Sequence, residues 1–122
     1  MPPSLSEIPH FDSSAIETLR SVAGDGATAF VAEMAQLFLE ETRDALSRLK
    51  QASALGDWKL VNRIAHSLKS SAATLGVMRL SASCRALELE TLTSTSGPRA
   101  MALVAAVLED FEQARPSLQR LV

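Results

Sequence analysis

The sequence predicts an all-α protein, an up-down-up-down antiparallel four-helix bundle with a short additional N-terminal helix. Aromatic residues make up only 4% of the 122 residues, and tyrosine is absent. The alternation of apolar and polar residues that is typical of strands never persists, whereas apolar residues recur at spacings of three and four in several long segments. Residues 1–11 are expected to be a flexible N-terminal segment, and residues 12–122 to form a single bundle domain with one core.

The first two helices are indicated by capping residues and by a long apolar stripe. The segment "DSSAIETLRSVAGD" predicts a short helix near residues 13–22, which Asp12 or Ser13 can cap and Gly24 can end in a left-handed conformation. A second helix over about residues 27–54 places small and apolar side chains on one face: Val31, Met34, Ala35, Phe38, Thr42, Ala45, Leu46, Leu49 and Ala52. The opposite face, which includes "EETRD", is charged and is expected to be a solvated surface, with partner docking as the less favoured alternative.

Glycines separate the next helices. In "LGDW", Gly56 ends the second helix and Asp57 can cap a third helix over about residues 58–75. Gly76 ends the third helix, and a fourth follows almost immediately and runs to about Thr93. Because these connections are short, consecutive helices should be antiparallel neighbours.

A fifth helix follows the turn cluster "TSTSGP". Pro98 suits its first turn, and Pro116 is expected to kink or end it, with "PSLQRLV" adding one or two last turns.

The composition argues against several classes of function. Twelve basic and 14 acidic residues give a net charge of −2, whereas a nucleic-acid-binding domain usually has a basic excess. The apolar runs are too short to cross a membrane and "MPPSLSEIPH" contains no readable secretory signal, so no membrane contact and a cytoplasmic location are expected. The single cysteine, Cys84, excludes an internal disulfide and is expected to be a small buried side chain. A monomer is expected because the long helices show no second apolar stripe.

One histidine of the third helix is predicted to be exposed. The apolar face of this helix consists of Trp58, Val61, Ile64, Ala65, Leu68, Ala72 and Leu75. His66 lies about 140° from the centre of that face, among Lys59, Asn62, Lys69, Ser70 and Ala73. Side chains on a helix lean toward its N-terminus, so Lys69, Ser70 and Ala73 cover the surface beside His66. Two of these three side chains are small, which leaves the imidazole accessible to another protein.

An exposed imidazole beside a lysine suits phosphoryl transfer. A neutral imidazole keeps a lone pair that can attack phosphorus, and Lys69 can donate hydrogen bonds to phosphoryl oxygens. The simpler alternative is a surface histidine beside a solvated lysine. No set of nucleophile, base and orienting acid is evident, and "AGDGAT" lacks the lysine and hydroxyl residue of a phosphate-binding loop. Neither ATP binding nor autonomous kinase activity is therefore expected.

The segment "AHSLKSSAATLGVMRLSASCRALE" resembles the signature of histidine-containing phosphotransfer (HPt) domains, A-H-x-L-K-[GS]-x5-G-x3-L-x3-C-x2-L-E. The matching positions are His66, Leu68, Lys69, Gly76, Leu80, Cys84, Leu87 and Glu88. Many members have glycine where this chain has Ser70, which is still small. The resemblance extends over approximately residues 12–115.

The resemblance implies that His66 is the phosphoacceptor and that Lys69 stabilises the phosphoryl charge. It implies a phosphorelay intermediate that accepts the phosphoryl group from a receiver-domain aspartyl phosphate and passes it to another receiver, commonly within a hybrid sensor histidine kinase. No cofactor is expected in this domain, whereas Mg²⁺ is expected in the partner receiver. The partner-binding surface is expected to include residues around the histidine, namely Lys59, Asn62, Ser70 and Ala73.

Two other classes of function remain as alternatives. A non-phosphorylated helical docking module could bind receiver domains or another regulatory partner through the same surface. A metal or cofactor bundle has little support, because the sequence lacks duplicated Glu-x-x-His pairs on helices, and the one such spacing, Glu7 to His10, is interrupted by Pro9.

Overall fold

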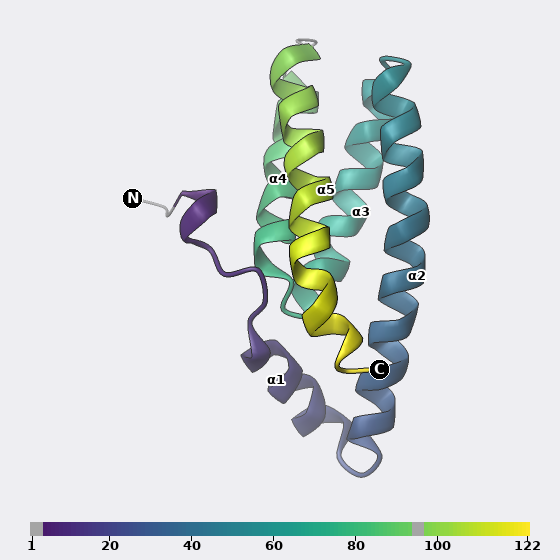
Figure 1. Ribbon diagram of the computed structural model, residues 1–122, viewed down its shortest axis with the longest axis vertical. Helices are drawn as coiled ribbons and strands as arrows, with labels where there is room; N and C mark the ends of the chain where they lie inside the picture. The colour runs from purple at the N-terminus through teal and green to yellow at the C-terminus, as the bar shows by residue number, and fades with distance from the viewer. Residues whose placement is uncertain (1–3, 94–96) are drawn as a thin grey trace.

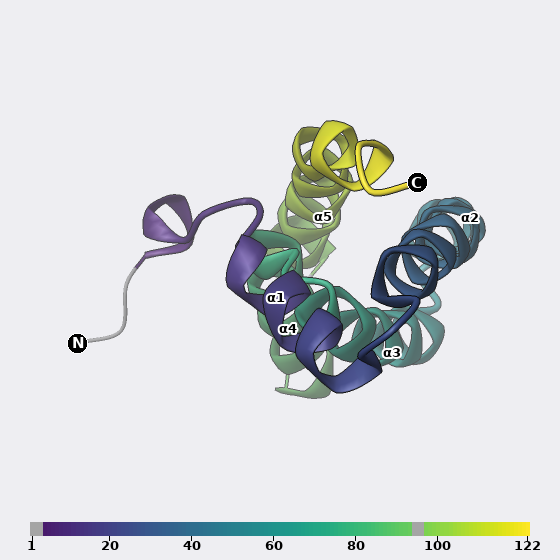
Figure 2. The ribbon, with the colours of Figure 1, turned by 90° about the horizontal axis from the view of Figure 1, so that it is seen from below.

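The computed structural model describes residues 4–93 and 97–122, and all regular secondary structure in these residues is helical. Helices α2, α3, α4 and α5 lie side by side as a bundle, and α1 lies across one end of it (Figures 1 and 2). Each helix of the bundle contacts the next, and α5 closes the bundle against α2. The predicted all-α four-helix bundle is therefore confirmed. The elements are η1 (Leu5–Glu7), α1 (Ser13–Ala23), α2 (Ala27–Ala54), α3 (Trp58–Thr74), α4 (Met78–Thr93) and α5 (Gly97–Gln119).

The limits of the first helices follow from local capping contacts. The side chain of Asp12 accepts a hydrogen bond from the backbone N–H of Ser14 at 3.0 Å, and that of Asp57 accepts one from Leu60 at 3.2 Å. Gly24, which directly follows α1, has a φ of 63°. The predicted capping roles of Asp12 and Asp57 and the predicted end of the first helix at Gly24 are thus confirmed.

The C-terminal helix continues past its proline. Helix α5 includes Pro116 and runs to Gln119, in agreement with the expected last turns in "PSLQRLV"; of the two expected effects of Pro116, it does not end the helix. Pro116 is exposed, and the helical pattern resumes directly after it, because the N–H of Arg120 donates to the Pro116 carbonyl at 3.2 Å. Proline has no N–H to donate to the backbone carbonyl four residues earlier, and at an exposed position water can bind that carbonyl instead. The predicted turn "TSTSGP" covers residues 93–98, of which 94–96 lie outside the described residues.

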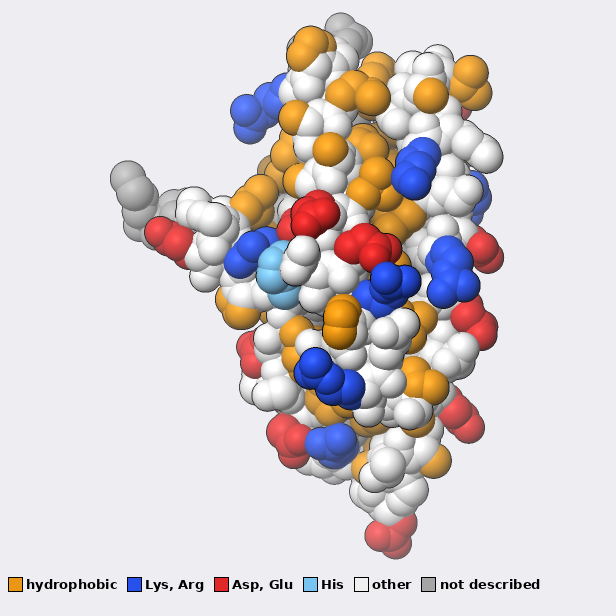
Figure 3. Space-filling model, viewed as in Figure 1, with side chains coloured by type: hydrophobic (Ala, Val, Ile, Leu, Met, Phe, Trp, Pro, Cys, Tyr) orange, Lys and Arg blue, Asp and Glu red, His pale blue; other side chains and the backbone are white. Residues whose placement is uncertain are grey.

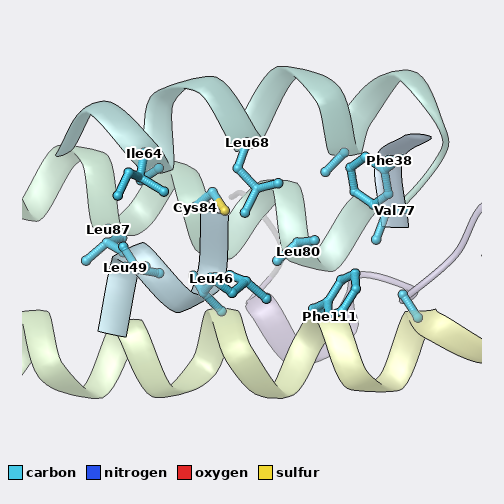
Figure 4. Packing of buried hydrophobic residues seen from close by; sticks show 14 of the residues in the cluster. Phe38, Leu46, Leu49, Ile64, Leu68, Val77, Leu80, Cys84, Leu87 and Phe111 are labelled. Atoms are coloured by element: carbon cyan, nitrogen blue, oxygen red, sulfur yellow. The ribbon is translucent and has the colours of Figure 1, made fainter. Parts of the chain in front are cut away.

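The apolar faces of the four long helices share one core (Figure 4). On α3 the predicted face is buried, except that Trp58 is only partly covered. Cys84 is fully buried between α3 and α5, and burial, with smaller contributions from nearby carboxylates, raises the pKa of its thiol to about 12. The thiol therefore acts as a small core side chain, as predicted.

Arg79 holds the N-terminal segment against the beginning of α4. Its guanidinium donates to the backbone carbonyls of Ile8 at 2.7 Å and Ser6 at 3.0 Å, and to Nε2 of His10 at 3.0 Å. Its backbone N–H donates to the carbonyl of Pro9 at 3.2 Å. Residues 6–10 thus lie along the bundle next to α4.

The side of the bundle seen in Figure 3 is formed by α5 and α2, with hydrophobic side chains along the seam between them. Leu46, Leu108 and Phe111 contribute to this seam, and Arg43 and Arg115 line its edges. Helices α3 and α4 form the opposite side of the bundle (Figure 2). None of the helices in the described part of the chain combines the length and hydrophobicity needed to span a membrane.

The turn between α3 and α4 requires a glycine. Gly76 has a φ of 78°, its carbonyl accepts a hydrogen bond from the Asp12 N–H at 2.7 Å, and a Cβ at this position would overlap the Asp12 backbone oxygen. Gly56 has a similar φ of 72°, but a Cβ there would meet no atom within 4 Å.

Replacing each glycine by alanine separates backbone strain from steric overlap. Both Gly56→Ala and Gly76→Ala should lower the free energy of unfolding by about 1–2 kcal/mol, because alanine is strained in the left-handed conformation that each glycine adopts. Gly76→Ala should lose roughly a further 1–3 kcal/mol, because the Asp12 backbone must move. Urea unfolding of the two variants measures the difference, and equal losses would contradict this explanation of the turn.

Candidate functional site

The imidazole of His66 stands on the outer surface of α3. The side chain is 65% exposed, although the apolar face of the same helix is buried beneath it. The predicted exposure of this histidine is therefore confirmed.

A carboxylate on the neighbouring helix contacts both His66 and Lys69. Glu88 of α4 accepts a hydrogen bond from Nδ1 of His66 through one oxygen, and from Nζ of Lys69 at 2.6 Å through the other. A carboxylate can only accept hydrogen bonds when ionised, so Nδ1 of His66 carries the hydrogen. The lone pair of the neutral ring then resides on Nε2, the nitrogen that Glu88 does not engage.

The hydrogen bonds from Lys69 and His66 favour the ionised form of Glu88. Its side chain is only 14% exposed, which by itself disfavours a charge. The hydrogen bond from Lys69, together with a smaller contribution from His66, nevertheless holds the pKa of the Glu88 carboxyl below its ordinary value. Glu88 is therefore ionised at neutral pH and attracts positive charge on either partner.

Hydrogen bonds between α3 and α4 lie on both sides of this cluster. The side-chain amide of Asn62 donates to the backbone carbonyl of Glu88 at 2.9 Å and to Oγ1 of Thr91 at 3.1 Å. On the other side, the hydroxyl of Ser81 donates to the backbone carbonyl of Lys69 at 2.9 Å. The pairing of these two helices thus sets the distance between His66 and Glu88.

A family model described as "Hpt domain" matches residues 33–117, which include the whole site and most of the four-helix bundle. The chain belongs to the HPt domain family. This assignment gives it a role in histidine phosphotransfer within phosphorelays.

A solved structure has the same fold as this HPt domain. The crystal structure of histidine-containing phosphotransfer protein B from Pseudomonas aeruginosa PAO1 aligns with a TM-score of 0.80 and 24% sequence identity, covering 92% of this chain and 93% of that chain. Comparison with curated proteins gave no significant match.

The HPt domain presents three of the four expected partner-binding residues beside the histidine. Lys59, Ser70 and Ala73 are exposed on α3. Asn62, the fourth residue expected in the partner-binding surface, is half-buried, and its amide is engaged by α4. Lys69 is only 29% exposed, since its ammonium group turns toward Glu88.

Glu88 is the site residue to which the sequence alone assigned no role, although it matches the last position of the HPt signature. The available signal was an acidic residue near the edge of the apolar face of the helix that follows His66 and Lys69. A carboxylate at that edge can reach cations on the preceding antiparallel helix.

The second histidine of the HPt domain lies in a different environment. His10 is half-buried, its Nε2 accepts a hydrogen bond from Arg79, and its buried Nδ1 has no hydrogen-bond partner in the described structure. The side chain of His10 is 28% exposed, against 65% for that of His66, so His66 is the more accessible of the two histidines. Within residues 4–93 and 97–122, no three His, Cys, Asp or Glu side chains come close enough together to hold a metal ion.

A groove between α2 and α3 adjoins the surface of His66. Apolar side chains form much of its lining, and Arg48 and Arg63 lie along it. The other lining residues are Phe38, Glu41, Thr42, Ala45, Leu60, Ile64, Ser67, Leu68 and Ser71. Arg63 and Ser67 are sequence neighbours of His66 on α3. The groove therefore provides a cationic, partly apolar surface next to the histidine.

The lowered pKa of Glu88 predicts how its contribution to stability depends on pH. Glu88→Gln should be less stable than the wild type at pH 7, because the amide lacks the negative charge that pairs with Lys69 and His66. As pH falls below the ordinary glutamate pKa of about 4.3, the unfolded chain binds the proton before the folded one does. The wild-type advantage should then be lost as pH falls through the lowered pKa of the folded state.

Urea unfolding between pH 7 and pH 3.5 measures this difference, with Glu33→Gln on the exposed face of α2 as the matched control. A stability difference that does not change with pH, or one no larger than that of Glu33→Gln, would contradict the role of Glu88.

Proposed function

We propose that this HPt domain accepts a phosphoryl group on Nε2 of His66 from a receiver-domain aspartyl phosphate and passes it to a second receiver. The observation that supports this proposal is the exposed ring of His66, in which Glu88 engages Nδ1 and leaves Nε2 open. The family assignment supports the same chemistry.

The transfer step needs no proton to leave the histidine. The Nε2 lone pair forms a bond to phosphorus, the bond between phosphorus and the receiver aspartate oxygen breaks, and the electron pair of that bond remains on the aspartate carboxylate. The ring gains positive charge as the new bond forms, while Nδ1 keeps its hydrogen. Glu88 stabilises this charge because its carboxylate already accepts from Nδ1. The reverse step passes the phosphoryl group to an aspartate of the second receiver.

Lys69 is proposed to stabilise the transferred group. It lies one turn after His66 on α3, and its ammonium carries three hydrogens, of which one is donated to Glu88. The others can bind phosphoryl oxygens without loss of that contact. The partner receiver is expected to hold the Mg²⁺ that neutralises further phosphoryl charge.

The docking surface is proposed to bind a negatively charged face of the receiver. Helix α3 contains three basic residues, Lys59, Arg63 and Lys69, and no acidic residue, although the chain as a whole has a net charge of −2. A receiver that carries an aspartyl phosphate brings negative charge to this helix. Ser70 and Ala73 are small enough to let the receiver approach the ring, and the groove at Arg48 offers further contact area.

Phosphorylation of His66 can be tested by transfer of radioactive phosphate from a phosphorylated receiver in the presence of Mg²⁺. The wild-type domain should become labelled and should pass label to a second receiver. His66→Gln should abolish labelling, whereas the matched control His10→Gln should retain it. Equal labelling of wild type and His66→Gln would contradict the proposal, and an unlabelled wild type that still binds receivers would instead support a non-phosphorylated docking module.

Charge reversal tests the docking surface. Arg63→Glu should slow association with the receiver by roughly 10-fold at low salt, because like charges then repel, and the difference should shrink as salt screens them. Arg43→Glu is the matched control, since Arg43 lines the seam between α2 and α5 on another side of the bundle. Stopped-flow binding measures both rates. Equal slowing by the two variants would contradict this placement of the receiver.

A further inference from the structure

Asn62 lies one helical turn before His66 and outside the HPt signature, which begins at Ala65. Its side-chain amide donates one hydrogen bond to the backbone carbonyl of Glu88 at 2.9 Å and another to Oγ1 of Thr91 at 3.1 Å. Both acceptors belong to α4, so the short side chain of Asn62 joins the two helices directly. Its half-buried position places these bonds at the edge of the core, where water competes less for them.

The backbone and the side chain of Glu88 are bound by different residues of α3. Asn62 binds its backbone carbonyl, whereas His66 and Lys69 bind its carboxylate. The hydroxyl of Thr91 lies within donating distance of the Leu87 carbonyl, at 2.9 Å, and its oxygen can still accept from Asn62. The donors and acceptors of this small network are therefore compatible with one another.

Apolar packing constrains the alignment of α3 and α4 less closely than these hydrogen bonds do. Leu80, Cys84 and Leu87 of α4 are fully buried and prevent large movements between the helices. Dispersion contacts have little directionality, however, whereas a hydrogen bond weakens steeply as its angle changes. Two bonds from one amide to neighbouring turns of α4 limit both sliding and rotation of that helix beside His66.

We propose that Asn62 is a positioning residue: by holding the backbone of Glu88 against α3, it keeps the Glu88 carboxylate on Nδ1 of His66 and thereby leaves Nε2 as the reacting nitrogen. The consequence for transfer rests on the proposed function, but the effect on the imidazole does not. Asn62 therefore acts through Glu88, and it need not touch the receiver.

Nitrogen-15 NMR of the His66 ring, recorded at a pH where the ring is neutral, measures the effect on the imidazole directly. The wild type should show predominantly the form with hydrogen on Nδ1. Asn62→Leu, which removes both donated bonds at similar volume, should shift the ring toward a mixture of the two tautomers. Its rate of phosphoryl transfer from a receiver should fall by roughly 10-fold, because small displacements of reacting groups are costly.

Three further variants make the result specific. Asn62→Ala also removes both hydrogen bonds and should shift the tautomers in the same direction. Because alanine has a high helix propensity, this variant replaces Asn62→Leu if the leucine variant does not fold. Thr91→Val leaves the bond to the Glu88 carbonyl possible and should have a smaller effect. Val107→Ala removes part of a fully buried side chain of α5, and it should lower stability without changing the His66 ring.

Wild-type tautomer populations in both Asn62 variants would overturn the proposal, as would an equal change in Val107→Ala. A wild-type domain that accepts no phosphoryl group would contradict the proposed function instead, and the tautomer measurement would still decide the role of Asn62.

Discussion

The antiparallel pairing of α3 and α4 is the constraint on which the site depends. His66 and Lys69 come from α3, whereas the carboxylate that they share comes from Glu88 of α4. The short turn at Gly76 allows α4 to return directly along α3, and hydrogen bonds from Asn62 and Ser81 join the two helices on either side of the cluster. Without this pairing, His66 would be a surface histidine with no means of distinguishing its two nitrogens.

The site contains few functional side chains because the proposed phosphoryl transfer needs few from this domain. Phosphoryl transfer depends mainly on positioning and on neutralisation of charge, and the partner can contribute much of both. In the proposed transfer, the domain supplies an exposed imidazole on a rigid helix, a carboxylate that defines its tautomer and a lysine one turn away. Cys84 is withdrawn from the surface by burial, and Nε2 of His10 is occupied by its contact with Arg79.

The sequence predicted features that arise from local interactions or from helical periodicity. Caps such as Asp12 and Asp57 act within one turn, so the helix limits could be read directly, and the exposure of His66 followed from its angle to the apolar face of α3. A helical wheel places a residue only relative to its own helix, however. It could not show that α4 covers Asn62, draws Lys69 inward and brings Glu88 to the imidazole. The sequence also left open whether Pro116 kinks or ends its helix, because that depends on how the freed carbonyl is satisfied in the folded chain.

Glu88 engages Nδ1 of His66, and Nε2 is therefore the proposed acceptor of the phosphoryl group. Phosphorus-31 and nitrogen-15 NMR of the phosphorylated domain distinguish the two ring positions directly. We expect a phosphorus–nitrogen bond at Nε2 of His66, with hydrogen still on Nδ1. A phosphoryl group on Nδ1 of His66, or on any other residue, would contradict this expectation.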